Sequence, residues 1–404
     1  MRILHTSDWH LGKRLENVSR INEQVSVMQE ICDIADNENV DAVIISGDLF
    51  DTYNPPTDAV DLFYKTLKRL TNSGQRPVIA IAGNHDSPDR IESPDPLARE
   101  CGILFAGYPN SQISPFKLDS GLEVTKSDEG FVELSIPGVI EPLRVLFTPY
   151  ANEYRLKTFL GYDDSEEELR NILQDKWGHL SEKYCDNKGV NILMTHLFVV
   201  KKGAAMPIEP DDEKPILHVG GAQAVYTDNI PKEIQYTALG HLHKKRVVAD
   251  SPSPIIYSGS PLGYSFGEVN QKKYVLIIDA SANKSVAIKD VELTSGKKLL
   301  RKRAESIEEA CEWLKENANA LVELTMVTDN YLTAEERKII NNSHDGIITL
   351  IPEVKNKTIL NNSGKVDIDI SKGMEALFED YFKYKHGQNP NERIKDLFKE
   401  ILSL

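Results

Sequence analysis

The sequence predicts an α/β protein in which strands and helices are stacked in layers, and two observations lead to this prediction. Short apolar runs typical of buried strands occur at residues 2–6, 41–46, 78–82, 144–147, 191–195 and 236–239. Between the early runs, apolar residues recur at helical spacing, first in Ile21, Val25, Met28, Ile31 and Ala35, then in Leu62, Phe63, Thr66, Leu67 and Leu70. Strands that alternate with amphipathic helices are typical of layered α/β cores.

Five of these strands run directly into side chains that can bind metal ions. The first leads to Asp8 and His10, the second to Asp48 and Asp51, and the third to Gly83-Asn84-His85-Asp86. The two later strands end at His196 and at Gly240-His241-Leu242-His243. Because the carboxyl ends of strands in an α/β sheet converge on the ligand crevice, we expect these side chains to share one site. Glycines at 47, 83 and 240 allow tight turns there.

The residue types predict a site for two divalent metal ions. Such sites hold ions about 3.5–4 Å apart and need a bridging carboxylate, so that both the attacking and the leaving oxygen of a phosphoryl group can be stabilised. A mixed shell of Asp, His and Asn suits Mn²⁺, Fe or Zn²⁺ better than Mg²⁺ or Ca²⁺. Each motif alone is more often structural. Their occurrence in order, each at a strand end, favours the metal site with these candidate ligands: Asp8, His10, Asp48, Asn84, His196, His241 and His243.

The series DxH, GDxxD, GNHD, H and GHxH resembles the motifs of the calcineurin-like metallophosphoesterases, and all five motifs are present. The resemblance implies a four-layered α/β/β/α sandwich with a dinuclear site at its strand ends. It also implies a bridging role for Asp48, and a general-acid role at the scissile phosphate for His85, oriented by Asp51. By the same motifs, a first ion would be held by Asp8, His10 and His243, and a second by Asn84, His196 and His241.

Within this family the chain is similar to bacterial nuclease subunits. The opening MRILHTSDWHLGK carries this likeness, together with GDLFD, ALGHLH and the YSGSP at 257–261. The likeness implies Mn²⁺-dependent hydrolysis of DNA, as a 3′→5′ exonuclease on double strands and an endonuclease on hairpins and single strands, in DNA repair, recombination and replication. It also implies an SMC-like coiled-coil ATPase as partner and a homodimer within a heterotetramer. The chain has no Gly-x-x-x-x-Gly-Lys-[Ser/Thr] motif, so an ATP-dependent step must come from that partner.

Changes in composition divide the chain into four expected parts. Residues 1–281 form the phosphoesterase domain, 282–353 a small α+β cap domain, 354–370 a linker, and 371–404 a two-helix element. The cap domain should contain strands at 287–293, 320–328 and 346–351, with capping boxes at Ser306–Glu309 and Thr333–Glu336 opening its helices. We expect its basic run, Lys297 to Arg303, to contact the DNA backbone, although a solvated surface run would look the same.

The two C-terminal helices present apolar faces that a hairpin of this length cannot bury against itself. One face contains Met374, Leu377, Phe378, Tyr381 and Phe382, and the other Ile394, Leu397, Phe398, Ile401 and Leu402. Either the hairpin packs on the chain's own core or it binds another protein. The preceding linker favours the second alternative, and the family resemblance implies that the ATPase is the partner.

Charge, cysteine content and hydrophobicity exclude or disfavour several classes of protein. A net charge of −15 argues mildly against a stand-alone nucleic-acid binder, although local basic patches matter more. The four cysteines are scattered without a CxxC pair, which fits a reduced cytoplasm and gives no zinc site. No apolar run approaches the length of a membrane span, and the N-terminus becomes polar too soon for a signal peptide. We therefore expect a cytoplasmic protein without a membrane partner.

Two other functions fit parts of the pattern. A calcineurin-like phosphatase or small-molecule phosphodiesterase would carry the same core motifs, but it would not need the cap domain and the tail. A catalytically inactive scaffold on the same fold would not need the full ligand set together with His85. The sequence therefore favours a DNA nuclease over both.

Overall fold

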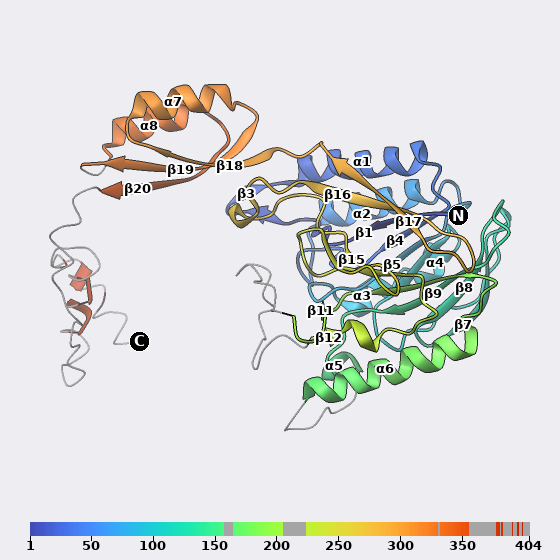
Figure 1. Cartoon of the computed structure of the whole chain (residues 1–404). Helices are drawn as coiled ribbons and strands as arrows, with labels where there is room; N and C mark the ends of the chain where they lie inside the picture. The colour runs from blue at the N-terminus through green and yellow to red at the C-terminus, as the bar shows by residue number, and fades with distance from the viewer. Residues whose placement is uncertain are drawn as a thin grey trace. The chain divides into compact units, whose positions relative to one another are not determined.

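The computed structural model of the protein describes residues 1–156, 165–204, 224–329 and 332–354, together with a few positions between 377 and 398. Two large sheets dominate these ranges (Figure 1). The first has six strands in the order β17-β16-β1-β4-β5-β6, and the second has seven in the order β14-β15-β13-β10-β9-β8-β7. Among the described helices, none has the length and hydrophobicity needed to cross a bilayer.

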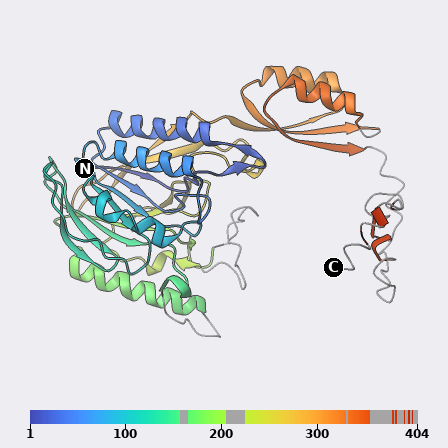
Figure 2. The ribbon, with the colours of Figure 1, turned by 180° about the vertical axis from the view of Figure 1, so that it is seen from behind.

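The first sheet has a parallel centre. Strands β1, β4, β5 and β6 are parallel, while β16 pairs antiparallel with β1, and β17 antiparallel with β16. The predicted helices connect the parallel strands and cover the outer face, as Figure 2 also shows from behind. The bounds are β1 Arg2–Thr6, α1 Ile21–Asn37, β4 Ala42–Ile45, α2 Thr57–Leu70, β5 Val78–Ile81, α3 Pro88–Glu92, α4 Asp95–Arg99, β6 Ile103–Ala106, β16 Lys273–Asp279 and β17 Ala287–Leu293.

The second sheet repeats this plan. Strands β9, β10, β13 and β15 are parallel, and antiparallel strands extend the sheet on both sides. Helix α6 covers its outer face. The bounds are β7 Glu123–Asp128, β8 Phe131–Ser135, β9 Leu143–Thr148, α5 Glu153–Leu156, α6 Ser165–Tyr184, β10 Val190–Thr195, β13 Tyr236–Leu239, β14 Arg246–Ala249 and β15 Ile255–Tyr257. Shorter elements are β2 Arg14–Leu15, β3 Val18–Ser19, β11 Val199–Val200, β12 Val225–Tyr226, η1 Thr227–Asn229 and η2 Phe266–Glu268.

Three apolar layers hold these elements together. Ile3, Ile44 and Ile192 belong to the layer between the two sheets. Leu4, which follows Ile3, and Val43, which precedes Ile44, point to the opposite face and pack against helices α1 and α2. Leu173 and Trp177 of α6 lie in the third layer, outside the second sheet. Because alternate strand residues face opposite sides, strands that are apolar throughout are buried on both faces. The four-layered α/β/β/α sandwich expected from the sequence is confirmed.

One strand belongs to a different sheet from the one expected. The sequence pattern places residues 287–293 in the cap domain, but β17 pairs with β16 along its whole length and forms the edge of the first sheet. The boundary near residue 282 therefore falls inside a β-hairpin of the phosphoesterase sheet. Hydrophobic pattern identifies a strand without identifying its partner, because any edge with free backbone groups can accept it.

The rest of the expected cap domain, after this hairpin, contains a separate three-stranded sheet in the order β18-β19-β20, with helices α7 and α8. The elements are β18 Lys298–Ala304, α7 Ile307–Glu316, β19 Ala320–Thr328, α8 Ala334–Ser343 and β20 Ile347–Val354. The predicted capping box at Thr333 and Glu336 is complete, whereas only half of the other one forms: the Ser306 hydroxyl accepts from the Glu309 amide, but the Glu309 carboxylate accepts from the Glu305 amide. Local sequence is sufficient here because each cap needs only residues within one helical turn.

The basic run of the cap domain is partly neutralised by its own neighbours. Arg301 pairs with Glu323 at 2.6 Å, and Lys302 pairs with Glu309 at 2.7 Å. At the start of the run, Lys297 and Lys298 are exposed, and no ion pair joins them to another described residue. Exposed ion pairs contribute only about 0–1 kcal/mol, so they weaken the positive field without preventing contacts with phosphate.

The chain divides into two compact units, Met1–Met326 with Thr333–Ile351, and Val327–Leu332 with Pro352–Leu404. Residues 355–370 of the expected linker, and most of the expected hairpin, lie outside the described residues. Among the described positions of the hairpin, the ring of Phe378 stacks on that of Phe398, with centroids 4.0 Å apart. Lys395 pairs with Glu379 at 2.9 Å. These two contacts join residues of the first expected helix to residues of the second.

Candidate metal centre

The loops that carry the candidate ligands leave the carboxyl ends of parallel strands in both sheets. Asp8, His10 and Asp48 have positive φ angles of 54°, 43° and 49°, and His241 has a φ of 109°. A left-handed conformation costs a non-glycine residue roughly 1–2 kcal/mol. The loops after β1 and β4 compensate by bonding to each other, since the Asp8 amide donates to Gly47 O at 2.9 Å and the His10 amide to Asp48 O at 3.0 Å. Backbone strain of this kind is typical of functional sites.

The three predicted glycines are required because the loops approach closely, and a Cβ at Gly240 would lie 1.8 Å from Ser46 O. A Cβ at Gly83 would lie 2.1 Å from Asp48 Oδ1, and one at Gly47, where φ is +90°, would lie 2.2 Å from His196 Nδ1. Any larger residue would therefore push a candidate ligand out of place. The glycines allow side chains from different strands to meet within hydrogen-bond distance.

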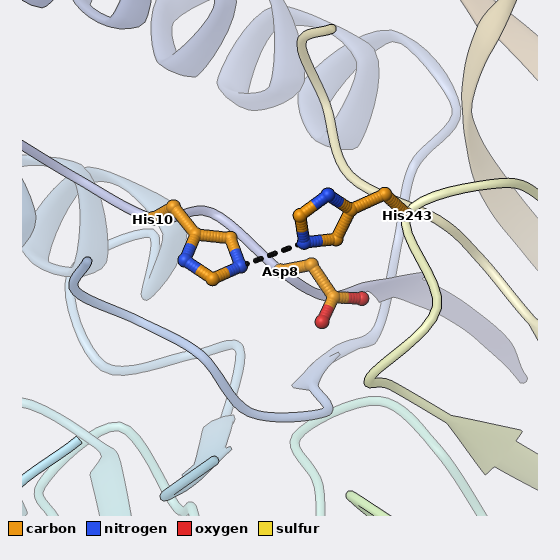
Figure 3. A group of neighbouring side chains, drawn as sticks. All are labelled: Asp8, His10 and His243. Atoms are coloured by element: carbon orange, nitrogen blue, oxygen red, sulfur yellow. Dashed lines mark hydrogen bonds between the residues drawn. The ribbon is translucent and has the colours of Figure 1, made fainter. Parts of the chain in front are cut away.

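The first group of candidate ligands consists of Asp8, His10 and His243 (Figure 3). The Nε2 atoms of the two histidines face each other at 2.9 Å. Asp8 is held by two donors, since its Oδ1 accepts from the His241 amide at 2.9 Å and its Oδ2 from the Ser7 hydroxyl at 2.5 Å. The potential ligand atoms of the three residues all lie within 4.8 Å of one another. Two imidazole lone pairs at this separation repel unless a proton or a cation lies between them.

The second group consists of Asn84, His196 and His241. Asn84 Oδ1 lies 2.9 Å from His196 Nε2 and 3.2 Å from His241 Nδ1. His241 thus presents its Nδ1 atom to the site, whereas the other histidines present Nε2. The motifs in the sequence do not distinguish the two nitrogens, because the choice depends on the turn after Gly240.

Asp48 lies between the two groups. Its Oδ2 atom is 3.3 Å from His196 Nε2 and 3.5 Å from His10 Nε2, while its Oδ1 accepts from the His85 amide at 2.9 Å. One carboxylate oxygen therefore faces both sets of imidazoles. The structure brings together all seven candidate ligands.

The far nitrogens of three histidines also face acceptors. His196 Nδ1 lies 2.7 Å from Ser46 O, His10 Nδ1 is 3.6 Å from Asp51 Oδ1, and His243 Nδ1 is 3.7 Å from Glu268 Oε1. A proton on Nδ1 directed at such an acceptor leaves the Nε2 lone pair available to a metal ion. Only His196 makes the hydrogen bond that is usual behind a metal-binding histidine, whereas the contacts of His10 and His243 with carboxylates are longer than a hydrogen bond.

The relation between His85 and Asp51 differs from the expected one. The family resemblance implies that the Asp51 carboxylate orients the His85 ring, but His85 Nδ1 bonds to the main-chain oxygen of Asp51 at 2.8 Å. The carboxylate instead pairs with Lys13 at 3.0 Å and faces His10. The ammonium of Lys13 draws the carboxylate to that side. The His85 ring lies against that of His10, with centroids 4.8 Å apart.

Sequence reasoning missed several residues that hold the loops. The Asp86 carboxylate accepts from the amides of Gly83, Leu49 and Phe50 at 2.8–3.0 Å, so it fixes two ligand loops at once. Buried Arg155 donates to Gly83 O at 2.7 Å and to Asp86 O at 2.8 Å. Asp86 was visible in the motif GNHD, whereas the residues around Arg155 carry no such signal.

Gln24 is a further residue of this kind. Its amide nitrogen donates to His10 O at 2.9 Å, and its amide oxygen accepts from the Gly12 amide at 3.0 Å. The predicted apolar face of helix α1 included Val25, but Val25 is 48% exposed and Gln24 is fully buried. In the sequence, Gln24 appears only as a polar residue that interrupts the apolar pattern of this helix.

The electrostatics of the centre fit divalent cations. Burial lowers the pKa of His10 to about 3, and burial with the nearby charge of His196 lowers the pKa of His241 to about 3, so both rings are neutral. Burial would raise the pKa of Asp48, but the positive charges of His196 and His85 hold it well below its usual range. Buried carboxylate beside neutral imidazoles is the donor set that Mn²⁺, Fe and Zn²⁺ prefer.

His196 is the exception. Burial would lower its pKa, but the charge of Asp48, a hydrogen bond with it, and the charge of Asp8 outweigh burial and raise the pKa to about 9. The imidazolium then supplies the positive charge that the buried carboxylates require. A metal ion that binds through His196 Nε2 must displace this proton.

Comparisons with known proteins show which proteins this chain is similar to. The model of the calcineurin-like phosphoesterase family matches residues 1–245. The SbcD subunit of the nuclease SbcCD from Bacillus subtilis (strain 168) is 34% identical over 412 residues, which cover 100% of this chain and 98% of that protein. The protein of the same name from Escherichia coli (strain K12) is 30% identical over 351 residues, which cover 84% of this chain and 81% of that protein.

The pKa of His196 predicts how metal binding depends on pH. Below about pH 9 the ring of the metal-stripped protein is protonated, and Mn²⁺ must release that proton, so affinity should rise by up to about tenfold per pH unit between about pH 6.5 and 8. Calorimetric titration in two buffers of different ionisation enthalpy would measure both the affinity and the protons released. An affinity that is constant over this range would contradict the assignment of the proton to a ligand.

Proposed function

This chain belongs to the calcineurin-like phosphoesterases and, among them, to the family of SbcD nuclease subunits, and we propose that it hydrolyses DNA phosphodiester bonds with two divalent metal ions. The observation that carries the proposal is the position of Asp48 Oδ2, which faces His10 on one side and His196 on the other, at 3.5 and 3.3 Å. A phosphoesterase centre of two metal ions needs one such shared carboxylate.

The proposed ligands follow the two groups. Asp8, His10 and His243 would hold the first ion, Asn84, His196 and His241 the second, and Asp48 both. Mn²⁺ is the ion we propose: the donors combine carboxylate, amide and imidazole, which suit Mn²⁺, Fe and Zn²⁺, and the family resemblance favours Mn²⁺ among the three. The ions would supply Lewis-acid activation of the phosphodiester and of the attacking water.

His85 is the proposed proton donor to the leaving oxygen. It is half-buried and its ring lies beside that of His10. Its Nδ1 atom is engaged by Asp51 O, so Nε2 is the nitrogen that can face a substrate. The buried Asp86 carboxylate holds the loop that carries it, and this support fixes the ring relative to the metal ligands.

DNA is the proposed substrate, with 3′→5′ exonuclease action on double strands and endonuclease action on hairpins and single strands. The relatives that cover most of the chain are nuclease subunits by name, and this supports the substrate class. In the cap domain, Lys297 and Lys298 are exposed and could contact phosphates. We place the reaction in the cytoplasm, where the four free thiols would stay reduced.

An SbcC-type coiled-coil ATPase is the proposed partner, in a heterotetramer with two copies of this chain. The sequence lacks a phosphate-binding loop for ATP, so an ATP-dependent step would need that partner. The apolar C-terminal helices are the proposed contact.

The proposal is tested by co-expressing the chain with such an ATPase and assaying labelled hairpin and linear duplex DNA with Mn²⁺, with and without ATP. We expect ATP-stimulated cleavage of both substrates and weak cleavage by the chain alone. Rapid hydrolysis of phosphoproteins or small phosphodiesters without any cleavage of DNA would instead favour a phosphatase.

Asp48→Ala should abolish Mn²⁺-dependent DNA cleavage and reduce the bound metal, because both ions would lose a ligand. Metal content would be measured by mass spectrometry of the dialysed protein, and folding by circular dichroism. Asp61→Ala, which removes an exposed carboxylate from helix α2, is the matched control and should behave as wild type. Full activity of Asp48→Ala would disprove the shared-carboxylate assignment.

His85→Gln should retain both metal ions and lose about 10²–10⁴-fold in the cleavage rate, since it removes a general acid but no ligand. Metal content and cleavage rate would be measured on the same preparation. The control is His179→Gln on helix α6, outside the metal centre. Loss of metal from His85→Gln would show that this residue is a ligand.

A chain that ends after Val354, the last residue of β20, should stay folded, keep its metal ions and hydrolyse bis(p-nitrophenyl) phosphate. It should fail to co-purify with the ATPase and lose ATP-stimulated DNA cleavage, because the apolar hairpin would be absent. Normal co-purification would place the contact elsewhere, and an insoluble product would indicate that the hairpin packs on the chain's own core.

A further inference from the structure

Behind His243, on the side away from His10, lies a carboxylate that the motif series does not include. Glu268 closes the short helix η2, and its side chain is 1% exposed. Its Oε1 atom lies 3.7 Å from His243 Nδ1. The ring of His243 is therefore placed between His10 Nε2 on one side and a buried carboxylate on the other.

Glu268 is fixed by its own contacts. Its Oε1 accepts from the amides of Tyr264 at 2.8 Å and Ser265 at 3.2 Å, which completes a capping box with Ser265. Its Oε2 pairs with the ammonium of Lys273 on strand β16. The side chain therefore has little freedom to turn away from His243.

Lys273 contacts the same histidine from a second direction. Its buried ammonium donates to His243 O at 3.0 Å and to the Ser260 hydroxyl at 2.9 Å. The ion pair thus contacts His243 at two points, since Lys273 donates a hydrogen bond to its main chain and the Glu268 carboxylate faces its ring at 3.7 Å, beyond hydrogen-bond distance.

The cost of burial argues that this pair serves the metal centre. Desolvating two charges costs several kcal/mol per ion, and apolar replacements of buried pairs are often equally stable. A carboxylate behind a metal-binding histidine, in contrast, fixes the tautomer and increases the basicity of the coordinating nitrogen. His10 is backed in the same way by Asp51 and Lys13, whereas His196 is backed by the neutral carbonyl of Ser46.

We propose that Glu268 and Lys273 are positioning residues, which hold His243 in the orientation and tautomer that bind a divalent ion. This inference rests on the ligand groups of the proposed function. It predicts that loss of the Glu268 carboxylate weakens the binding of one of the two ions. Glu268 and Lys273 contact His243 but not the ligands proposed for the other ion, Asn84, His196 and His241.

The test is a Mn²⁺ titration without DNA, followed by electron paramagnetic resonance of the free ion. Glu268→Gln keeps the size of the side chain but removes its charge, and Glu268→Gln/Lys273→Met also removes the unpaired lysine. In both variants, one class of site should bind Mn²⁺ about 10–100-fold more weakly while the other stays near wild type. Activity should return as Mn²⁺ is raised, which a merely structural defect would not permit.

The matched control is Glu292→Gln, because Glu292 of strand β17 pairs at 2.7 Å with exposed Lys272, which directly precedes strand β16. It should leave the Mn²⁺ titration unchanged. The inference would be overturned if the titration curves of Glu268→Gln and of the double variant matched that of the wild type. If the single variant does not fold, the titration of the double variant decides. A wild-type chain that binds Mn²⁺ but does not cleave DNA would contradict only the proposed function.

Discussion

The carboxylate of Asp48 is the contact on which both halves of the metal centre depend. Its Oδ2 atom faces histidines from both large sheets, His10 after β1 and His196 after β10. This position requires the loops after β1, β4 and β5 to approach more closely than ordinary residues allow. The approach is possible because Gly83 has no Cβ and because Asp86 accepts hydrogen bonds from the loops after β4 and β5. A substitution of Gly83 or of Asp86 would therefore move Asp48 and disturb both groups of candidate ligands.

The stability of the fold compensates for an unfavourable centre. Buried carboxylates, facing imidazole lone pairs and left-handed backbone at Asp8, His10 and Asp48 all oppose folding. The three apolar layers, one between the two sheets and one outside each sheet, supply the opposing free energy, since each fully buried large aliphatic side chain contributes about 1.5–3 kcal/mol. Cations at the centre would remove much of the repulsion, so metal binding and the stability of these loops should be coupled.

The contacts behind the histidines divide the centre into two unequal halves. The histidines of the first group are backed by carboxylates that are paired with lysines, Asp51 with Lys13 and Glu268 with Lys273. In the second group, His196 is backed by a main-chain carbonyl, and His241 is turned to present Nδ1. Because a carboxylate makes an imidazole more basic than a carbonyl does, the two groups would offer different electronic environments to two identical metal ions.

The layered α/β fold, the five strands that lead to the candidate site and the set of side chains at their ends could be predicted from the sequence. Buried strands, helix caps and strand-end motifs are encoded within a few consecutive residues, so no knowledge of distant contacts is needed. The sheet that accepts Ala287–Leu293 and the nitrogen that His241 presents became known only from the folded chain. The same holds for the position of Asp51 beside His10, and for the support that Gln24, Arg155 and Glu268 give to the ligands. These features join residues that are distant in the chain, and their geometry is set by packing between elements, which local sequence patterns do not record.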